Sequence, residues 1–292
     1  CHILVVHWCP VPRRIVESAS DLRVIATARA GLENLASDAI LARRIPLIHA
    51  VGRNADSVAE YTVGLMLAES RNVARGHELL RRGIWQRTYS NTHSVKDMRG
   101  STVGIIGLGQ VGRGVARRLS GFDVRLVGHD PFAEPQVFDT YSVERLSLHD
   151  VLKNADYVTI HVRLADDTRG LIGRPELALM KPTAYLINTA RAAIVDQDAL
   201  VEALTLGRIA GAALDVFEQE PLSNSSPLLK LDNVTITPHL AGRTISGYSK
   251  GPQIVSKAIF DLIGGRRLDN EILVNPGAIT NELERDLRSL CR

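Results

Sequence analysis

The sequence has few aromatic residues, little cysteine and no long apolar run. Only 4% of its 292 residues are Phe, Trp or Tyr, so it lacks the stacking platform on which single-stranded nucleic acids bind. No stretch approaches the roughly 18 uncharged apolar residues of a membrane-spanning helix, and the opening residues lack the charged region and cleavage site of a signal peptide. We therefore expect no nucleic-acid partner and no membrane insertion.

Neither sign of charge dominates the chain. The 35 Lys and Arg residues face 32 Asp and Glu residues, for a formal net charge of +3, and the dibasic pairs are scattered as on solvated helix faces. Three cysteines, Cys1, Cys9 and Cys291, form no CxxC pair and leave an odd thiol, which fits a reducing compartment. We expect a cytoplasmic protein. The histidines show no metal-ligand spacing such as HExxH, so we predict no metal site.

Short β-branched runs alternate with helical patterns along the chain. The strands are apolar throughout, as in a parallel sheet covered by helices on both faces. A long helix is expected from a Ser57-to-Glu60 capping box to about residue 82 without interruption, and another from about residue 244 to 263. Strands are expected at residues 3–7, 23–27, 45–49, 102–106, 124–128, 157–160, 184–187, 211–214 and 234–236.

This alternation predicts an α/β protein with a doubly wound parallel sheet of the Rossmann type. At about 150 residues per domain, the length corresponds to two domains. We place the Rossmann domain at residues 99–242 and a second, discontinuous α/β domain at residues 1–98 and 243–292. A sheet whose first strand starts at Ile3 would expose an edge, so we expect the native N-terminus to lie further upstream.

A glycine-rich loop follows the expected strand 102–106. Gly107, Gly109 and Gly112 have the GxGxxG spacing and lead directly into a helical pattern, which is the context in which this motif binds a dinucleotide. The glycines allow a tight turn, close approach of a pyrophosphate and close helix packing, and the helix N-terminus attracts the phosphates. Asp130 lies 18 residues beyond Gly112, at the end of the next strand, where it can bind the ribose hydroxyls. Because no arginine directly follows Asp130, NAD is favoured over NADP.

Three polar side chains follow the ends of three other expected strands: Arg191, Glu220 and His239. Ligands bind at this edge of a parallel sheet. Taken singly, a surface ion pair or an ordinary loop histidine is the commoner explanation of such residues. Together, beside a dinucleotide site, they suit hydride transfer: His239 moves the proton, Glu220 holds the imidazole, and Arg191 pairs with a substrate carboxylate. A 2-oxo or 2-hydroxy acid is the substrate class that needs these groups.

Four motifs carry a resemblance to the D-isomer-specific 2-hydroxyacid dehydrogenases. They are VGIIGLGQVG at 103–112, INTAR at 187–191, ALDVFEQEP at 213–221 and TPH at 237–239. The resemblance implies an NAD(H)-dependent oxidoreductase that interconverts a D-2-hydroxy acid and its 2-oxo acid, with 3-phosphoglycerate, glyoxylate or hydroxypyruvate, or a sugar-derived acid as substrate. It also implies a flavodoxin-like second domain and a homodimer formed through the cofactor domain. The alternative is an NAD(H)-sensing scaffold of the corepressor type, which resembles these enzymes.

The resemblance also implies roles for single residues. Arg191 would clamp the substrate carboxylate, Glu220 would be the partner of His239 in acid–base catalysis, and Asp215 would contact the nicotinamide carboxamide. The implied cofactor site comprises Gly107, Gly109, Gln110, Val111, Gly112, Asp130, Thr189, Ala190, Asp215 and Gly242. The implied substrate site comprises Arg29, Gly31 and Asn54 of the first domain with Arg191 and His239.

Four features depart from the family pattern. The strand and helix that precede the first strand in the family are absent, the loop at Arg29 is one residue shorter, and Ala192 replaces the usual glycine. Near His7, where phosphoglycerate enzymes have basic groups, no arginine aligns, and Arg29 or Arg53 could substitute. We therefore expect the substrate domain to begin upstream of Cys1, and substrate choice to differ from that of other members.

Overall fold

The computed structural model describes residues 1–289, so Cys291 lies outside the described residues. The chain divides into two compact units, which are Ala55–Gly242 and Cys1–Asn54 together with the segment from Arg243 onward. Within the described residues, no helix is both long enough and apolar enough to cross a membrane.

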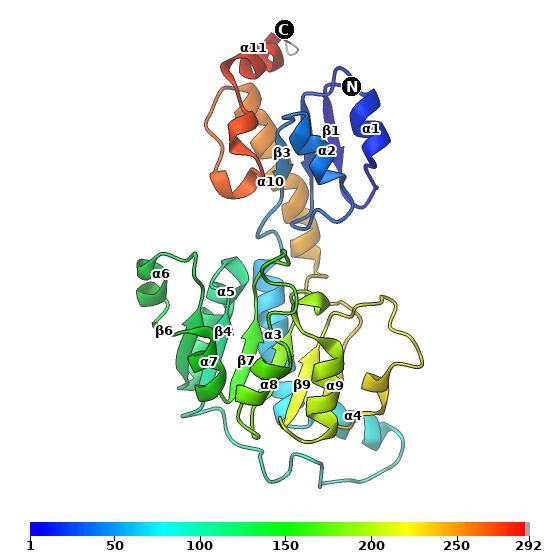
Figure 1. Cartoon of the computed structure of the whole chain (residues 1–292), viewed down its shortest axis with the longest axis vertical. Coiled ribbons are helices and arrows are strands. Elements are labelled where there is room, and N and C mark those ends of the chain that lie inside the picture. Colours follow the sequence, from blue (N-terminus) through cyan, green and yellow to red (C-terminus); the bar gives the residue numbers. More distant parts are fainter. Residues whose placement is uncertain (290–292) are drawn as a thin grey trace. The chain divides into compact units, whose positions relative to one another are not determined.

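The larger unit contains a seven-stranded sheet in the order β10-β9-β8-β7-β4-β5-β6 (Figure 1). All neighbouring strands are parallel. The strands are β4 (Thr102–Ile106), β5 (Arg125–His129), β6 (Val143–Arg145), β7 (Tyr157–Ile160), β8 (Tyr185–Asn188), β9 (Gly211–Leu214) and β10 (Val234–Ile236). The strand order reverses at β4, which lies between β5 and β7. Open α/β sheets bind ligands at such a switch point, outside the carboxyl ends of the strands.

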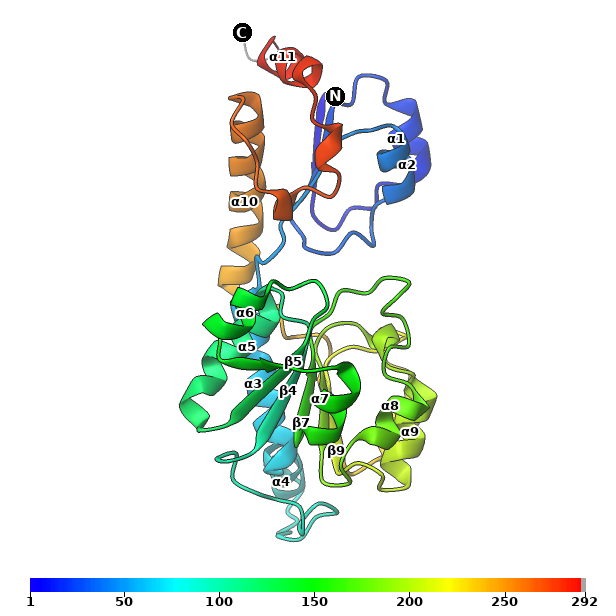
Figure 2. The same ribbon diagram turned by 60° about the vertical axis from the view of Figure 1, so that its left-hand side comes forward.

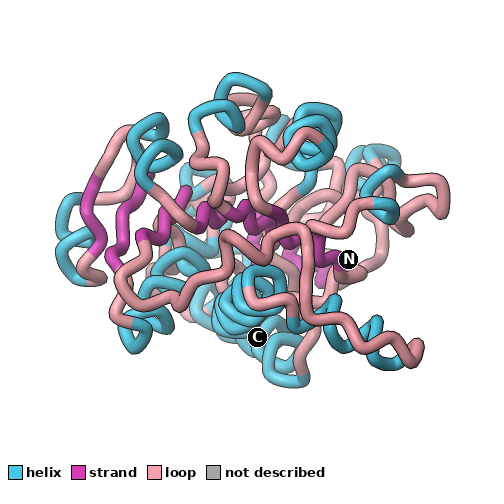
Figure 3. Tube along the Cα trace, turned by 90° about the horizontal axis from the view of Figure 1, so that it is seen from below, coloured by secondary structure: helices cyan, strands magenta, loops and turns pink. Residues whose placement is uncertain are grey.

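Helices cover both faces of this sheet (Figures 2 and 3). Those on one face are α3 (Ala55–Ser70), α5 (Gln110–Leu119) and α6 (Pro135–Thr140), and those on the other are α7 (Leu148–Asn154), α8 (Arg174–Leu179) and α9 (Gln197–Thr205). Successive strand residues point to opposite faces, so Ile105 packs in the first layer and Ile106 in the second. The apolar strands predicted from the sequence therefore form a sheet buried on both sides, and the predicted Rossmann-type fold is confirmed.

The single long helix expected over residues 57–82 is wrong. α3 ends at Ser70, and α4 (Val73–Arg81) begins after Asn72, whose φ of 57° is left-handed. Asn tolerates this conformation, which stops a helix. The expected capping box is also wrong, because α3 begins at Ala55 and Ser57 lies inside its first turn. Strand β6 was not predicted, since it has three residues and a single buried side chain, Val143.

The compact units divide at residue 54, whereas the sequence placed the domain boundary at residue 98. Helix α3 belongs to the larger unit because Ala59, Val63 and Met66 pack in the same core as the strands. Gly114 of α5 permits this packing, since a Cβ there would lie 3.0 Å from the Cβ of Ala59.

The smaller unit has a three-stranded parallel sheet in the order β1-β2-β3. Its strands are β1 (Ile3–Val6), β2 (Val24–Thr27) and β3 (Leu47–His49), and its helices are α1 (Arg13–Ser18), α2 (Ser37–Ala42), α10 (Ile245–Ile263) and α11 (Asn281–Ser289). Helices α1 and α2 share a core with one face of the sheet, and α10 and α11 share a core with the other. Leu273 forms an antiparallel bridge with Ile48. The segment after residue 242 therefore completes the core that residues 1–54 begin.

Candidate active site at the carboxyl edge of the larger sheet

The glycine loop joins β4 to α5 at the switch point. Gly107 has a φ of 94°, and a Cβ there would lie 2.8 Å from the backbone of His161 and Val162, so only glycine fits. At Gly109, the N-cap of α5, a Cβ would meet nothing within 4 Å. Gln110 and Val111 begin the helix directly after this open space, and Gly112 packs against Gly107. The loop thus has the open cradle at a helix N-terminus that a pyrophosphate fits.

Asp130 follows β5, and its carboxylate holds the glycine loop. Oδ2 accepts the Leu108 N–H at 2.8 Å, and Oδ1 accepts the N–H groups of Phe132 and Ala133 at 2.9 and 3.1 Å. A carboxylate has about four acceptor positions, so one is left for a ribose hydroxyl. Sequence reasoning missed this anchoring role, because a hydrogen bond between two separate loops leaves no local signal.

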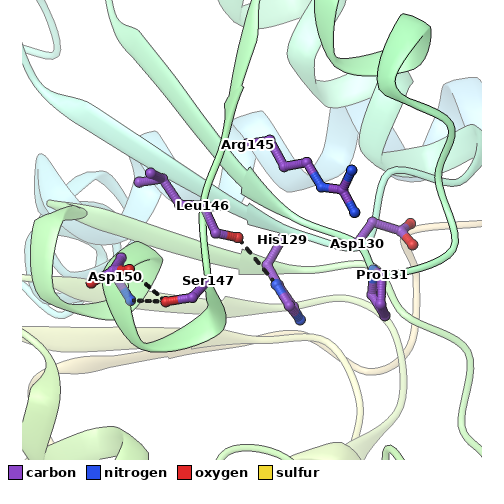
Figure 4. Close-up of a pocket in the computed structure, with 7 residues that line it drawn as sticks. All are labelled: His129, Asp130, Pro131, Arg145, Leu146, Ser147 and Asp150. Carbon is purple, nitrogen blue, oxygen red and sulfur yellow. Dashed lines mark hydrogen bonds between the residues drawn. The ribbon is translucent and has the colours of Figure 1, made fainter.

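A pocket opens where β5 and β6 end (Figure 4). It is lined by His129, Asp130, Pro131, Arg145, Leu146, Ser147 and Asp150. Arg145 is the last residue of β6, and its guanidinium points toward Asp130. His129 Nδ1 donates to the Leu146 carbonyl at 3.2 Å. Sequence reasoning missed Arg145, because it considered only the residues that directly follow Asp130.

His239 and Glu220 form a hydrogen-bonded pair. His239 Nδ1 lies 2.8 Å from Glu220 Oε2, and Glu220 Oε1 accepts the Phe217 N–H at 3.1 Å. An ionised carboxylate only accepts hydrogen bonds, so Nδ1 carries the proton and Nε2 is left for another partner. The side chains are 49% and 38% exposed, which leaves the imidazole within reach of a small molecule.

Asp215 is fully buried and braces the loop that carries His239. Its Oδ1 accepts the Thr237 hydroxyl at 2.6 Å and the Leu240 N–H at 2.8 Å, and its Oδ2 accepts the Ala241 N–H at 2.8 Å. His239 has a φ of 54°, a left-handed conformation that costs a non-glycine residue about 1–2 kcal/mol. The three bonds offset this cost. The nicotinamide contact of Asp215 stays a prediction, and so does the assignment of Gly242, which follows Ala241, to the cofactor site.

Arg191 lies in a turn that Asn188 holds. Asn188 Oδ1 accepts the Ala190 N–H and its Nδ2 donates to the Arg191 carbonyl, both at 3.0 Å. The Thr189 hydroxyl is 2.8 Å from the Thr62 hydroxyl of α3. Sequence reasoning missed Asn188 and Thr62 as positioning residues. The INTAR motif contains Asn188 and gave a usable signal, whereas Thr62 is far away in the sequence and gave none.

His161 follows β7 and packs behind the glycine loop. Burial lowers its pKa to about 3, so the ring is neutral at physiological pH. Its Nε2 lies 2.9 Å from the Thr159 hydroxyl. His161 therefore adds no positive charge beside the cradle.

In the smaller unit, each strand is followed closely by a basic side chain: His7 after β1, Arg29 after β2 and Arg53 after β3. The expected substrate residues Gly31 and Asn54 lie in the same loops. Because the strands are parallel, their carboxyl ends share one edge of the sheet. This edge therefore carries two arginines, of which Arg29 pairs with Glu33 at 3.6 Å.

Arg53 is only 8% exposed, and its Nη1 donates to the Gly247 carbonyl at 2.8 Å. Its Nε and the Nε2 of His7 are buried without a hydrogen-bond partner. Burial, with the charges of Arg53 and Arg29, lowers the pKa of His7, and burial with the charge of Arg29 lowers the pKa of Arg53. Arg29 stacks on Trp8 at 4.0 Å. Arg53 is one of the two arginines that the sequence offered in place of the basic groups of phosphoglycerate enzymes, whereas the side chain of His7 was not expected to take part.

Comparison with known proteins gives consistent matches. Residues 63–241 match the profile of the D-isomer specific 2-hydroxyacid dehydrogenase, NAD binding domain. The chain is 38% identical over 263 residues to a D-3-phosphoglycerate dehydrogenase of Methanocaldococcus jannaschii, covering 90% of this chain and 49% of the relative. It is also 38% identical over 257 residues to a glyoxylate reductase of Thermofilum pendens, covering 87% of this chain and 76% of the relative.

A solved structure with a similar fold is the apo form of Rhodotorula graminis D-mandelate dehydrogenase, with a TM-score of 0.82 and 27% identity over 91% of this chain and 82% of that one. The chain spans about half the length of the phosphoglycerate dehydrogenases that it matches.

Proposed function

The chain belongs to the D-isomer specific 2-hydroxyacid dehydrogenase family, and from this premise we propose that it is an NAD(H)-dependent oxidoreductase interconverting a D-2-hydroxy acid and its 2-oxo acid. The observation that carries the proposal is the 2.8 Å bond between His239 and Glu220 at the same sheet edge as the glycine loop. A nicotinamide dinucleotide, when bound, supplies or accepts the hydride.

Proton transfer and substrate binding fall to three side chains of the larger unit. In reduction, His239 donates a proton from Nε2 to the 2-oxo oxygen while the carbon gains a hydride, so the carbonyl becomes an alcohol. Glu220 stabilises the protonated imidazole and fixes its orientation. Such acid–base catalysis is typically worth about 10²- to 10⁴-fold in rate. Arg191 pairs with the substrate carboxylate through its planar guanidinium and orients the carbonyl.

We propose further that the acid carries a second anionic group, as 3-phosphoglycerate does. The support is the carboxyl edge of the smaller sheet, where a buried Arg53 has no carboxylate partner among the described residues. Buried charges are normally paired. Sequence identity does not decide the substrate, because the phosphoglycerate dehydrogenase and the glyoxylate reductase are equally identical to this chain.

Variants of the acid–base pair test the reaction. We expect His239→Ala to reduce kcat at least ~10²-fold and Glu220→Gln about 10-fold or more, with NADH affinity within about twofold of wild type. His77→Ala, an exposed histidine of α4, is the matched control and should leave turnover unchanged. Near-normal turnover of His239→Ala would remove this residue from the mechanism.

A substrate-preference measurement tests the second anionic group. Arg53→Met should lower the ratio of kcat/KM for phosphohydroxypyruvate over hydroxypyruvate at least ~10-fold, the effect of one charge-assisted contact. Arg43→Met is the control, because Arg43 donates to the Ala19 carbonyl in the same unit and should leave the ratio unchanged. An unchanged ratio in Arg53→Met would contradict the proposed substrate class.

We also propose a cytoplasmic homodimer formed through the cofactor domain. Its support is the family resemblance and the sparse, unpaired cysteines, of which Cys1 and Cys9 are free and exposed. Light scattering of the purified chain measures the mass directly, and a monomer at micromolar concentration would contradict the proposed dimer.

A further inference from the structure

The pocket at the ends of β5 and β6 contains an arginine that the order of the strands brings there. Gly128 of β5 lies opposite Arg145 of β6, so Arg145 ends its strand close to Asp130. Figure 4 shows the Arg145 guanidinium extending toward Asp130, the residue expected to bind the ribose. Cofactor choice in Rossmann-type sheets is decided at this position, where an acid favours a free 2′-hydroxyl and an arginine accepts a 2′-phosphate. Here both residue types are present.

The carboxylate of Asp130 already accepts hydrogen bonds from within the protein. Three backbone N–H groups donate to its carboxylate, including that of Leu108 in the glycine loop. These dipoles stabilise the negative charge, and they leave only one acceptor position for a ribose hydroxyl. Asp130 therefore repels a nearby phosphate less strongly than it would if its carboxylate lacked these donors.

Arg145, in contrast, has no carboxylate partner in the part of the chain that the structure describes. Its Cζ lies 5.4 Å from the centre of the Phe138 ring, a buried side chain that anchors it. The other acids nearby have their own partners. Asp150 accepts the Ser147 hydroxyl at 2.6 Å, and Glu144 pairs with Arg125 at 2.6 Å. The guanidinium fork is therefore available for an oxoanion, and phosphate suits its geometry.

We propose that Arg145 binds the 2′-phosphate of NADP(H), so that the protein accepts both nicotinamide dinucleotides and not NAD(H) alone. This inference rests on the proposed function, which places the adenosine half of the dinucleotide at this edge of the sheet. It differs from the expectation based on the residues following Asp130, because the arginine comes from the neighbouring strand.

The direct test measures binding of two probes that need no turnover, AMP and adenosine 2′,5′-bisphosphate. Calorimetry on the full chain should give the bisphosphate an affinity at least as high as that of AMP. Arg145→Gln should weaken bisphosphate binding at least ~10-fold, as expected for loss of a charge-assisted contact, and change AMP binding by less than about twofold. Arg87→Gln, at an exposed arginine in the loop after α4, is the matched control and should change neither.

Kinetics supply a second readout. With one 2-oxo acid, the ratio of kcat/KM for NADPH over NADH should fall about 10-fold in Arg145→Gln and stay constant in Arg87→Gln. The proposal would be overturned if the wild type bound AMP but bound the bisphosphate at least ~10-fold more weakly, and if Arg145→Gln left bisphosphate binding unchanged. Failure of both probes to bind would instead overturn the dinucleotide site itself. Because Arg145 is exposed, its variant should fold, and an unchanged melting temperature verifies this.

Discussion

Asp215 offers the sharpest test of how the His239 loop is held. In Asp215→Asn, the remaining oxygen can still accept from Thr237 and Leu240, but the new amide group faces the Ala241 N–H, a donor against a donor. The bond lost is a buried one to a charged acceptor, worth about 1.5–3 kcal/mol. For a unit of this size, 1 kcal/mol shifts the melting temperature by about 2–4 °C. The expected decrease is therefore about 3–12 °C.

The measurement is thermal unfolding by circular dichroism without any dinucleotide. The brace consists of hydrogen bonds within the chain, so the melting temperature should fall even when no cofactor is present. Turnover should also fall about 10-fold or more, because His239 loses its fixed position. Asp198→Asn, exposed in the first turn of α9, should leave both unchanged. A normal melting temperature combined with weaker NADH binding would refute the brace and leave Asp215 as a nicotinamide contact only.

Three further predictions concern the neighbouring residues. Asp130→Ala should weaken NADH binding about 10-fold and speed hydrogen exchange of the Leu108 amide, and unchanged exchange would contradict its anchoring of the glycine loop. His161→Gln should reduce the loss of stability on acidification. The imidazole of the unfolded chain gains a proton below about pH 6.5, whereas that of the folded chain does so only near pH 3. The free energy of unfolding of the wild type should therefore fall by about 2 kcal/mol between pH 7 and pH 5, a loss that the variant does not share. Equal losses for both proteins in urea unfolding would refute this. Thr62→Val should lower kcat several-fold by releasing Thr189, and unchanged kinetics would show that this bond is not needed.

Most of the fold could be predicted, because hydrophobic burial leaves a pattern in the sequence. The strands of the larger sheet that are buried on both faces, such as β4 and β9, appear as apolar runs and lie within a residue of their expected bounds. Strand β6 has one buried side chain and leaves no such run. The break after α3 depends on the backbone conformation of Asn72, and asparagine is compatible with a helix as well as with its end.

The candidate site could be predicted where each residue lies in the loop that follows an apolar strand. Arg191, Glu220 and His239 were expected on this basis, and the structure places Glu220 and His239 within hydrogen-bond distance. The supporting residues could not be predicted in the same way. Thr62 meets Thr189 from another element, and Arg145 reaches the pocket only because β6 lies beside β5. Such contacts depend on strand order and on loop conformation, which no local pattern encodes.

The most direct test of the proposed activity follows NADH absorbance with glyoxylate, hydroxypyruvate, phosphohydroxypyruvate, pyruvate and sugar-derived 2-oxo acids, together with the configuration of the product. We expect NADH to be consumed with at least one of these acids, with one equivalent of the D-2-hydroxy acid formed for each NADH. NADH that binds and is not consumed with any of them, or a product of L configuration, would contradict the proposed function.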